Sequence, residues 1–165
     1  MEATGLGSAV LVGNSMGCQV IAELAVRNPA RVERAVLQGP TMDPGARNLP
    51  QQVARLALDT LREPPSLLLI ELLDLLAAGP LRGLRTFHHA TDDRIEKKLP
   101  MLRAPTLVMH GGRDPIVPEH WAREVADDLL PDGRLIVVPE AAHAMNYDAP
   151  SELARHVRAF IRGRF

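Results

Sequence analysis

Residues 8–17 read Ser8-Ala-Val-Leu-Val-Gly-Asn-Ser-Met-Gly17, and this stretch decides the fold. It opens with a continuous apolar run, which predicts a strand that is covered on both faces, as in a parallel sheet. Apolar residues at helical spacing follow Ser15 to about Asn28, where Pro29 ends the pattern. Strand, tight turn and helix in this order form the setting of a nucleophile elbow.

The pattern G-x-S-x-G over Gly13–Gly17 predicts that Ser15 is a nucleophile. Such a turn is so tight that its serine takes a strained backbone conformation, and we expect a side chain at Gly13 or Gly17 to collide across it. The backbone N–H of Met16 and the start of the helix then point at an oxyanion. The pattern by itself is weak, because a plain glycine-containing turn between a strand and a helix can have the same sequence.

A nucleophilic serine needs a histidine that takes its proton and an acid that holds this histidine. The sequence has both, and each follows a predicted strand: Asp114 comes after residues 106–109, and His143 after residues 134–138. The gap between them holds one helix and one strand, which returns His143 to the edge of the sheet where Asp114 lies. We therefore predict a triad of Ser15, Asp114 and His143.

The rest of the chain alternates apolar runs with helical patterns, which is typical of an α/β fold with a parallel sheet. We expect about four strands, at residues 8–13, 32–37, 106–109 and 134–138, with flanking helices. Residues 41–99 are Leu-rich, broken by prolines and without a strand signal, so they predict a helical cap between core segments 1–40 and 100–165. Within it, Ser66–Ala78 is apolar almost all round, and we expect it to bury more than one face.

Length and composition narrow the class of protein. The 165 residues, 46% hydrophobic and 24% charged, predict one globular domain. A net charge of −1 and few aromatic residues argue against a nucleic-acid partner. No stretch reaches the ~20 apolar residues of a membrane span, and no secretory signal opens the chain, so we expect no membrane partner. The single cysteine, Cys18, indicates a reducing, cytoplasmic setting.

The chain resembles the C-terminal two-thirds of an α/β-hydrolase fold enzyme. The resemblance is carried by Leu11–Gly17, Arg31–Pro40, Ala104–Asp114 and Ala142-His143, in the chain order Ser, Asp, His of that fold. The sequence Gly-Asn-Ser-Met-Gly, with a helical lid after the next strand, is similar to the meta-cleavage-product hydrolases and related carboxylic-ester hydrolases.

This resemblance implies a serine hydrolase that cleaves an ester or an activated C–C bond of a small, largely apolar substrate, without a metal or organic cofactor. A serine at the elbow argues against the dehalogenases and epoxide hydrolases of this fold, which resemble it but have an aspartate there.

The resemblance also implies strands before Ser8–Gly13 that this sequence does not contain, together with the loop that donates a second oxyanion N–H. We therefore expect an exposed backbone edge on Ser8–Gly13 and an impaired site, as in a truncated or split member of the family. The alternative is a catalytically silent fragment or assembly module that pairs with another chain, or with itself, through this edge.

Other candidate residues have structural interpretations. Residues 110–112 (His-Gly-Gly) resemble an oxyanion motif but lie after the serine. We therefore interpret them as the end of the strand that carries the acid. His89 and Asp93 lie one helical turn apart without a third ligand, which predicts a solvated helical face and no metal site. Cys18 is predicted to be a buried, inert thiol, and Asp148 to be the N-cap of a closing helix that begins at Pro150.

Overall fold

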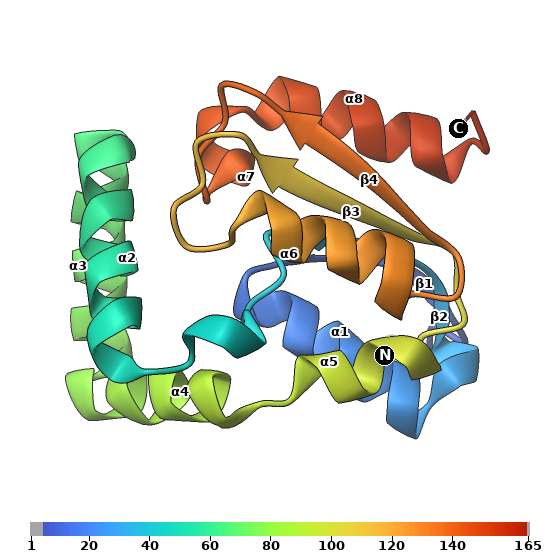
Figure 1. Cartoon of the computed structure of the whole chain (residues 1–165), viewed down its shortest axis with the longest axis horizontal. Helices are drawn as coiled ribbons and strands as arrows, with labels where there is room; N and C mark the ends of the chain where they lie inside the picture. The colour runs from blue at the N-terminus through green and yellow to red at the C-terminus, as the bar shows by residue number, and fades with distance from the viewer. Residues whose placement is uncertain (1–4, 165) are drawn as a thin grey trace.

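A computed structural model describes residues 5–164, apart from the side chain of Leu49. Four parallel strands form one sheet in the order β1-β2-β3-β4 (Figure 1). Their bounds are Ala9–Asn14 for β1, Val32–Gln38 for β2, Thr106–Gly111 for β3 and Gly133–Val138 for β4. The predicted α/β class and parallel sheet are confirmed.

The α-helices are α1 (Met16–Arg27), α2 (Leu49–Arg62), α3 (Pro65–Ala78), α4 (Pro80–Asp92), α5 (Ile95–Lys98), α6 (Glu119–Glu124), α7 (Met145–Asp148) and α8 (Pro150–Ile161). Short 3₁₀ segments lie at Pro29–Arg31, Pro44–Ala46 and Leu99–Met101, and a π-helical turn at Val125–Leu129 follows α6. The expected closing helix is α8, and it begins at Pro150 as predicted.

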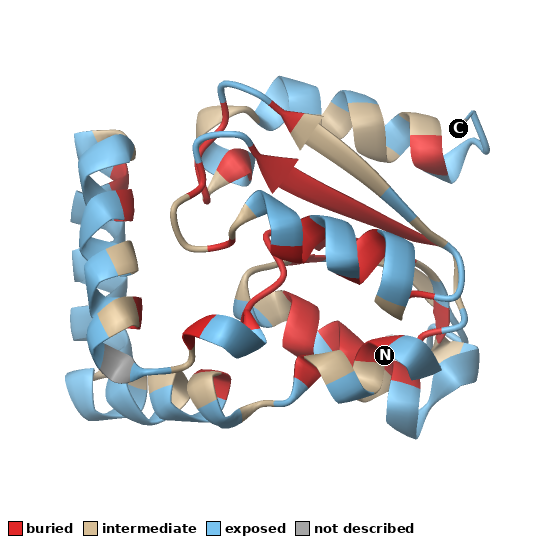
Figure 2. Ribbon diagram, viewed as in Figure 1, coloured by how far each residue is buried: buried red, intermediate tan, exposed pale blue. Residues whose placement is uncertain are grey.

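The core has two halves, one on each face of the sheet. Helices α1 and α6 cover one face, where Ile21 and Trp121 pack with Leu37 of β2. Helices α7 and α8 cover the other face, where Phe160 packs with Val36 of β2. Because both faces are covered, all six residues of β3 are buried, and Figure 2 shows this strand red along its length. Continuous apolar runs are the sequence pattern of such strands.

The strand β1 forms one edge of the sheet. Within residues 5–164 it pairs with β2 on one side and with no strand on the other. The side chain of Val12 in this strand is 53% exposed. The expected exposed edge is therefore present in the described part of the chain.

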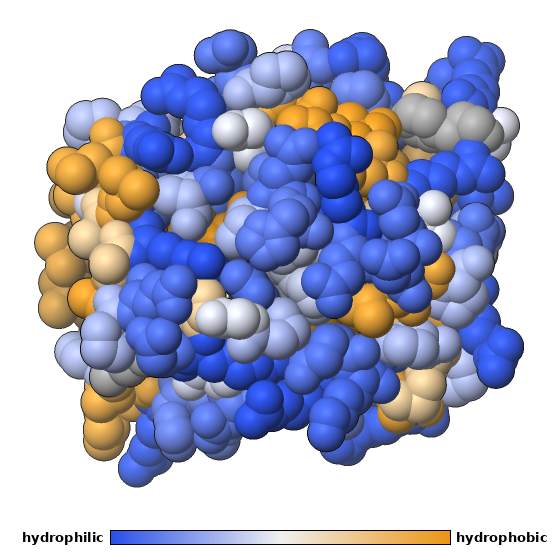
Figure 3. All heavy atoms as spheres, in the orientation of Figure 1, coloured by the Kyte–Doolittle hydropathy of each residue, from blue (hydrophilic) through white to orange (hydrophobic). Residues whose placement is uncertain are grey.

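The segment 41–99, here called the helical insertion, contains α2 to α5 and no strand in its described residues. The prediction that Ser66–Ala78 buries more than one face is wrong. In α3 only Leu67 is buried, and seven large apolar side chains are 42% to 59% exposed: Leu68, Leu69, Ile70, Leu72, Leu73, Leu75 and Leu76. Figures 1 and 3 show why: α3 stands next to α4 at one end of the molecule, away from the sheet, and apolar surface gathers there.

An all-round apolar pattern favours burial but does not specify a partner. In the described structure, α3 packs mainly on α4. None of the described helices is long and apolar enough to span a membrane.

Candidate active site

Ser15 lies in the turn between β1 and α1 with a φ of 53°, the left-handed region that non-glycine residues rarely adopt. Its N–H donates to the Gln38 carbonyl at 2.9 Å, which ties the turn to the end of β2. A Cβ on Gly13 would lie 2.7 Å from the carbonyl carbon of Gly17, so position 13 requires glycine as predicted. The collision predicted for Gly17 itself is wrong, because a Cβ there would face open space.

The carboxylate of Asp114 is held in the loop after β3. Its Oδ1 accepts hydrogen bonds from the N–H groups of Ile116, at 2.8 Å, and Val117, at 2.9 Å. Its Oδ2 lies 2.8 Å from Nδ1 of His143, and both side chains are almost fully buried. One oxygen is thus fixed by the backbone, and the other is left for the imidazole. The predicted pairing of these two residues is present in the structure.

The loops that carry the acid and the base are joined through their backbones. The N–H of Gly112 donates to the carbonyl of Val138 at 2.8 Å, and that of Arg113 to the carbonyl of Ala141 at 3.0 Å. The ladder between β3 and β4 therefore continues past the ends of the strands and brings Asp114 and His143 to the same edge of the sheet.

His143 is also tied to the serine turn. Its carbonyl accepts from the side-chain amide of Asn14, at 3.2 Å, and from that of Gln38, at 3.1 Å. Asn14 directly precedes Ser15, so the turn and the histidine loop are anchored to one another. The Nε2 atom of His143 is buried and has no hydrogen-bond partner among the described residues, and the Ser15 hydroxyl therefore does not bond to it in this structure.

The charge around His143 is strongly negative. Burial of the ring lowers its pKa, but the hydrogen bond to Asp114 and the charges of Asp114, Asp59 and Glu63 outweigh this, and the net effect raises the pKa above its usual value. Burial raises the pKa of Asp59 to about 6, and the neighbouring carboxylates add to the effect. Asp59 lies in the last turn of α2 and Glu63 directly follows the helix, so both belong to the helical insertion.

Sequence reasoning missed Asp59 and Glu63. Their spacing of four residues places them on one side of a helix, and this spacing was the sequence signal that could have indicated a shared role. Acids at this spacing are common on solvated helices, so the pattern does not reveal that they face the histidine.

A cavity of about 330 Å³ opens beside Ser15. Its lining is largely apolar and includes Met42 from the loop after β2, Leu56 from α2 and Phe87 from α4. The helical insertion thus forms much of the wall opposite the serine.

Comparisons with known proteins identify the family and the fold. Residues 2–156 match the sequence model of the alpha/beta hydrolase family. The chain belongs to this family. It is 30% identical to the human serine hydrolase BPHL over 81 residues, which are 48% of this chain and 28% of that protein.

Solved α/β-hydrolase structures show the same fold. Bromoperoxidase from Bacillus anthracis matches with a TM-score of 0.80 at 18% identity, over 98% of this chain and 70% of that one. A predicted CIB-like hydrolase from Thermoplasma acidophilum matches with a TM-score of 0.64 at 17% identity, over 98% of this chain and 54% of that one. At these identities the likeness shows the fold alone. The chain spans 28% of its human relative and about half, 54%, of the Thermoplasma protein.

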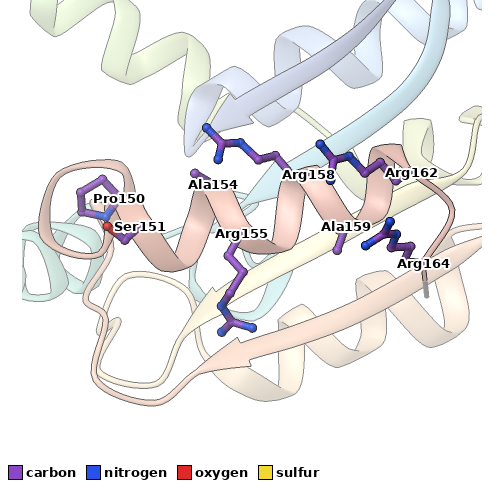
Figure 4. A pocket seen from close by; sticks show the side chains of 8 residues that line it. All are labelled: Pro150, Ser151, Ala154, Arg155, Arg158, Ala159, Arg162 and Arg164. Atoms are coloured by element: carbon purple, nitrogen blue, oxygen red, sulfur yellow. The ribbon is translucent and has the colours of Figure 1, made fainter.

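This α/β hydrolase has a second cavity on the outer side of α8, of about 590 Å³ (Figure 4). Its lining comes from residues 150–164 and includes four arginines: Arg155, Arg158, Arg162 and Arg164. None of the predicted triad residues lines it, so it is separate from the candidate active site.

The remaining candidates take structural positions. Cys18 is fully buried, its thiol donates to the carbonyls of Gly13 and Gln38, and burial raises its pKa far above the usual value, as expected of an inert thiol. His89 is exposed on α4, and no group of three or more metal-binding side chains occurs in the described part of the chain. His110 is buried at the end of β3.

Asp148 does not cap α8, and that prediction is wrong. The N-cap position is Ala149, and no side chain caps the helix. A short helix, α7, ends at Asp148 and turns its carboxylate back, so that Oδ2 accepts from the N–H of Ala142 at 2.6 Å. Asp148 therefore supports the residue before His143.

Proposed function

We propose that this α/β hydrolase is a serine hydrolase with Ser15 as nucleophile, His143 as general base and acid, and Asp114 as the residue that orients His143. The observation that carries the proposal is the 2.8 Å contact between His143 Nδ1 and Asp114 Oδ2, with Nε2 buried and unpartnered in the described structure. An imidazole held in this way has its basic nitrogen available for a serine proton.

In the proposed reaction, Ser15 Oγ bonds to the substrate carbonyl carbon while its proton moves to Nε2 of His143. The Asp114 carboxylate stabilises the imidazolium that forms. The oxyanion accepts a hydrogen bond from the N–H of Met16, at the positive end of α1. The leaving group then takes the proton from Nε2, and water, activated by the same nitrogen, releases the acyl group from Ser15.

The proposed substrate is a small, largely apolar ester, or a compound with an activated C–C bond beside a carbonyl. The apolar lining of the cavity beside Ser15 supports this choice, as does the relation to a human serine hydrolase. We propose that the helical insertion is a cap that closes this cavity over core segments 1–40 and 100–165.

Labelling with a fluorophosphonate probe tests the proposal, because such probes phosphonylate activated serines. We expect the folded protein to be labelled at Ser15, and Ser15→Ala to abolish both labelling and hydrolysis of p-nitrophenyl butyrate. Cys18→Ser, which removes the nearby buried thiol, is the matched control. It should keep both the labelling and the hydrolysis. A folded protein that takes no label at Ser15 would contradict the proposal.

A second candidate role is assembly through the edge strand β1. It is supported by the unpaired side of β1 in residues 5–164 and by the exposed Val12 side chain. In this role the chain pairs, through that edge, with a strand of another chain or of a second copy.

A further inference from the structure

Helix α2 of the helical insertion is fastened to the loop that carries Asp114. Near its middle, Arg55 donates to the carbonyl of Ile116 at 3.1 Å. At its last residue, Arg62 donates to the carbonyl of Arg113 at 2.8 Å. The two contacts lie on either side of Asp114 in the chain, so the position of α2 is set relative to the acid.

The residue directly after α2 reaches the other loop. Oε1 of Glu63 accepts a hydrogen bond from the N–H of Ala144, directly after His143, at 2.8 Å. The Glu63 N–H donates to the Asp59 carbonyl at 2.9 Å, which fixes the backbone from which this carboxylate extends. Its second oxygen, Oε2, is buried and has no partner among the described residues.

His143 is therefore held on both sides along the chain. Before it, Ala141 and Ala142 are bound by the backbone of Arg113 and by the carboxylate of Asp148. After it, the Ala144 carbonyl accepts from the N–H groups of Tyr147 and Asp148 in α7, while its N–H donates to Glu63, which belongs to the helical insertion and not to the sheet. A peptide N–H in a partly buried place that loses its acceptor pays a desolvation penalty, so its loop shifts toward another partner or water.

We propose that Glu63 is a positioning residue: by accepting the Ala144 N–H, it fixes the backbone that carries the His143 imidazole and couples the seating of the helical insertion to the geometry of the base. The inference rests on the proposed serine-hydrolase function. Glu63 acts through the peptide group of Ala144 and touches no reacting atom.

The matched control is the neighbouring contact between Tyr147 and Ser66. The Tyr147 hydroxyl donates to Ser66 Oγ at 2.8 Å and so links α7 to α3. Ser66→Ala removes this bond but leaves both the Glu63 contact and the backbone bond from Tyr147 N–H to the Ala144 carbonyl in place. If any bond between the helical insertion and residues 144–148 is sufficient, Ser66→Ala and Glu63→Ala should have the same effect on kcat. If Glu63 positions the base, they should differ.

The experiment compares Glu63→Ala, Glu63→Gln and Ser66→Ala in steady-state hydrolysis of p-nitrophenyl butyrate. Small displacements of a catalytic group cost up to about a hundredfold in rate, so we expect Glu63→Ala to lower kcat by about tenfold to a hundredfold with KM changed by less than about threefold. Glu63→Gln keeps an oxygen that accepts the Ala144 N–H, so it should retain most of the activity. Ser66→Ala should match the wild type.

A second readout is the NMR signal of the His143 Nδ1 proton bonded to Asp114, recorded in a Ser15→Ala background. We expect Glu63→Ala to shift or broaden this signal, and Glu63→Gln and Ser66→Ala to leave it sharp. Equal kcat and an unchanged signal in Glu63→Ala would overturn the positioning role. Should Glu63→Ala not fold, Glu63→Asp, whose carboxylate is one methylene shorter, takes its place with the same two criteria.

The two proposals fail separately. A wild-type protein that takes no fluorophosphonate label rejects the serine-hydrolase function, while the imidazole signal still decides whether Glu63 orders the histidine loop. A labelled wild type with an unaffected Glu63→Ala variant rejects only the role of Glu63.

Discussion

At the scale of single residues, the candidate site is governed by an excess of negative charge around one histidine. Asp114 contacts the ring, and Asp59 and Glu63 add charge from α2, so the pKa of His143 is raised although its ring is buried. The proposed base works only when Nε2 is unprotonated. The raised pKa therefore moves the acid limb of activity to higher pH than an ordinary histidine gives.

The variant Asp59→Asn tests this electrostatic effect. The pKa of Asp59 is about 6, so above that pH its carboxylate is charged and favours the protonated imidazole. Removing the charge lowers the pKa of His143, and the acid limb of kcat/KM against pH should move to lower pH. On the plateau above both pKa values the rate should stay within about threefold of the wild type, since the charge then no longer decides whether the base is neutral.

The control for this measurement is Glu33→Gln, which removes an exposed carboxylate from β2. Its pH profile should superimpose on that of the wild type. An acid limb that is unmoved in Asp59→Asn, or moved to higher pH, would contradict the assigned effect of Asp59.

At the scale of elements, the strands and the order of the site residues were predictable, because each rests on a local pattern. The apolar run before Ser15 predicts β1, and Asp114 and His143 each follow a strand of the same kind. The misassigned features depend on neighbours distant in the chain. Asp148 precedes Pro150 as an N-cap would, yet the turn of α7 directs its carboxylate to Ala142. The contact between Glu63 and Ala144 joins segments that no sequence pattern relates.

Helix α3 gives the element-scale prediction. Because Leu69 and Leu73 are 58% and 56% exposed, replacing both by glutamine should change the free energy of unfolding by less than about 1 kcal/mol, as is usual for surface positions. Leu99 is fully buried in the half of the core that α1 covers. Leu99→Ala should lower the free energy of unfolding by about 2–5 kcal/mol. Urea unfolding followed by circular dichroism measures both. Equal losses would show that the leucines of α3 are covered in solution.

At the scale of the whole molecule, one surface open to association is the edge of the sheet, which β1 forms in the described residues. A lysine on an edge strand opposes pairing with another strand, because the charge would be buried in the new sheet. If the chain assembles through β1, Val12→Lys should shift the protein toward the monomer in size-exclusion chromatography with light scattering. Val20→Lys, at an exposed position on α1 outside the strand, is the control. A wild type that is monomeric at all concentrations would reject assembly between copies of this chain.

The backbone bonds between the loops after β3 and β4 have a wider consequence. Since Gly112 and Arg113 are held to Val138 and Ala141 through peptide groups, the spacing between the two loops is set by the main chain. The walls of the cavity come largely from other side chains of the helical insertion, such as Leu56 and Phe87. These can change with the substrate while Asp59 and Glu63, which act on His143, stay as they are.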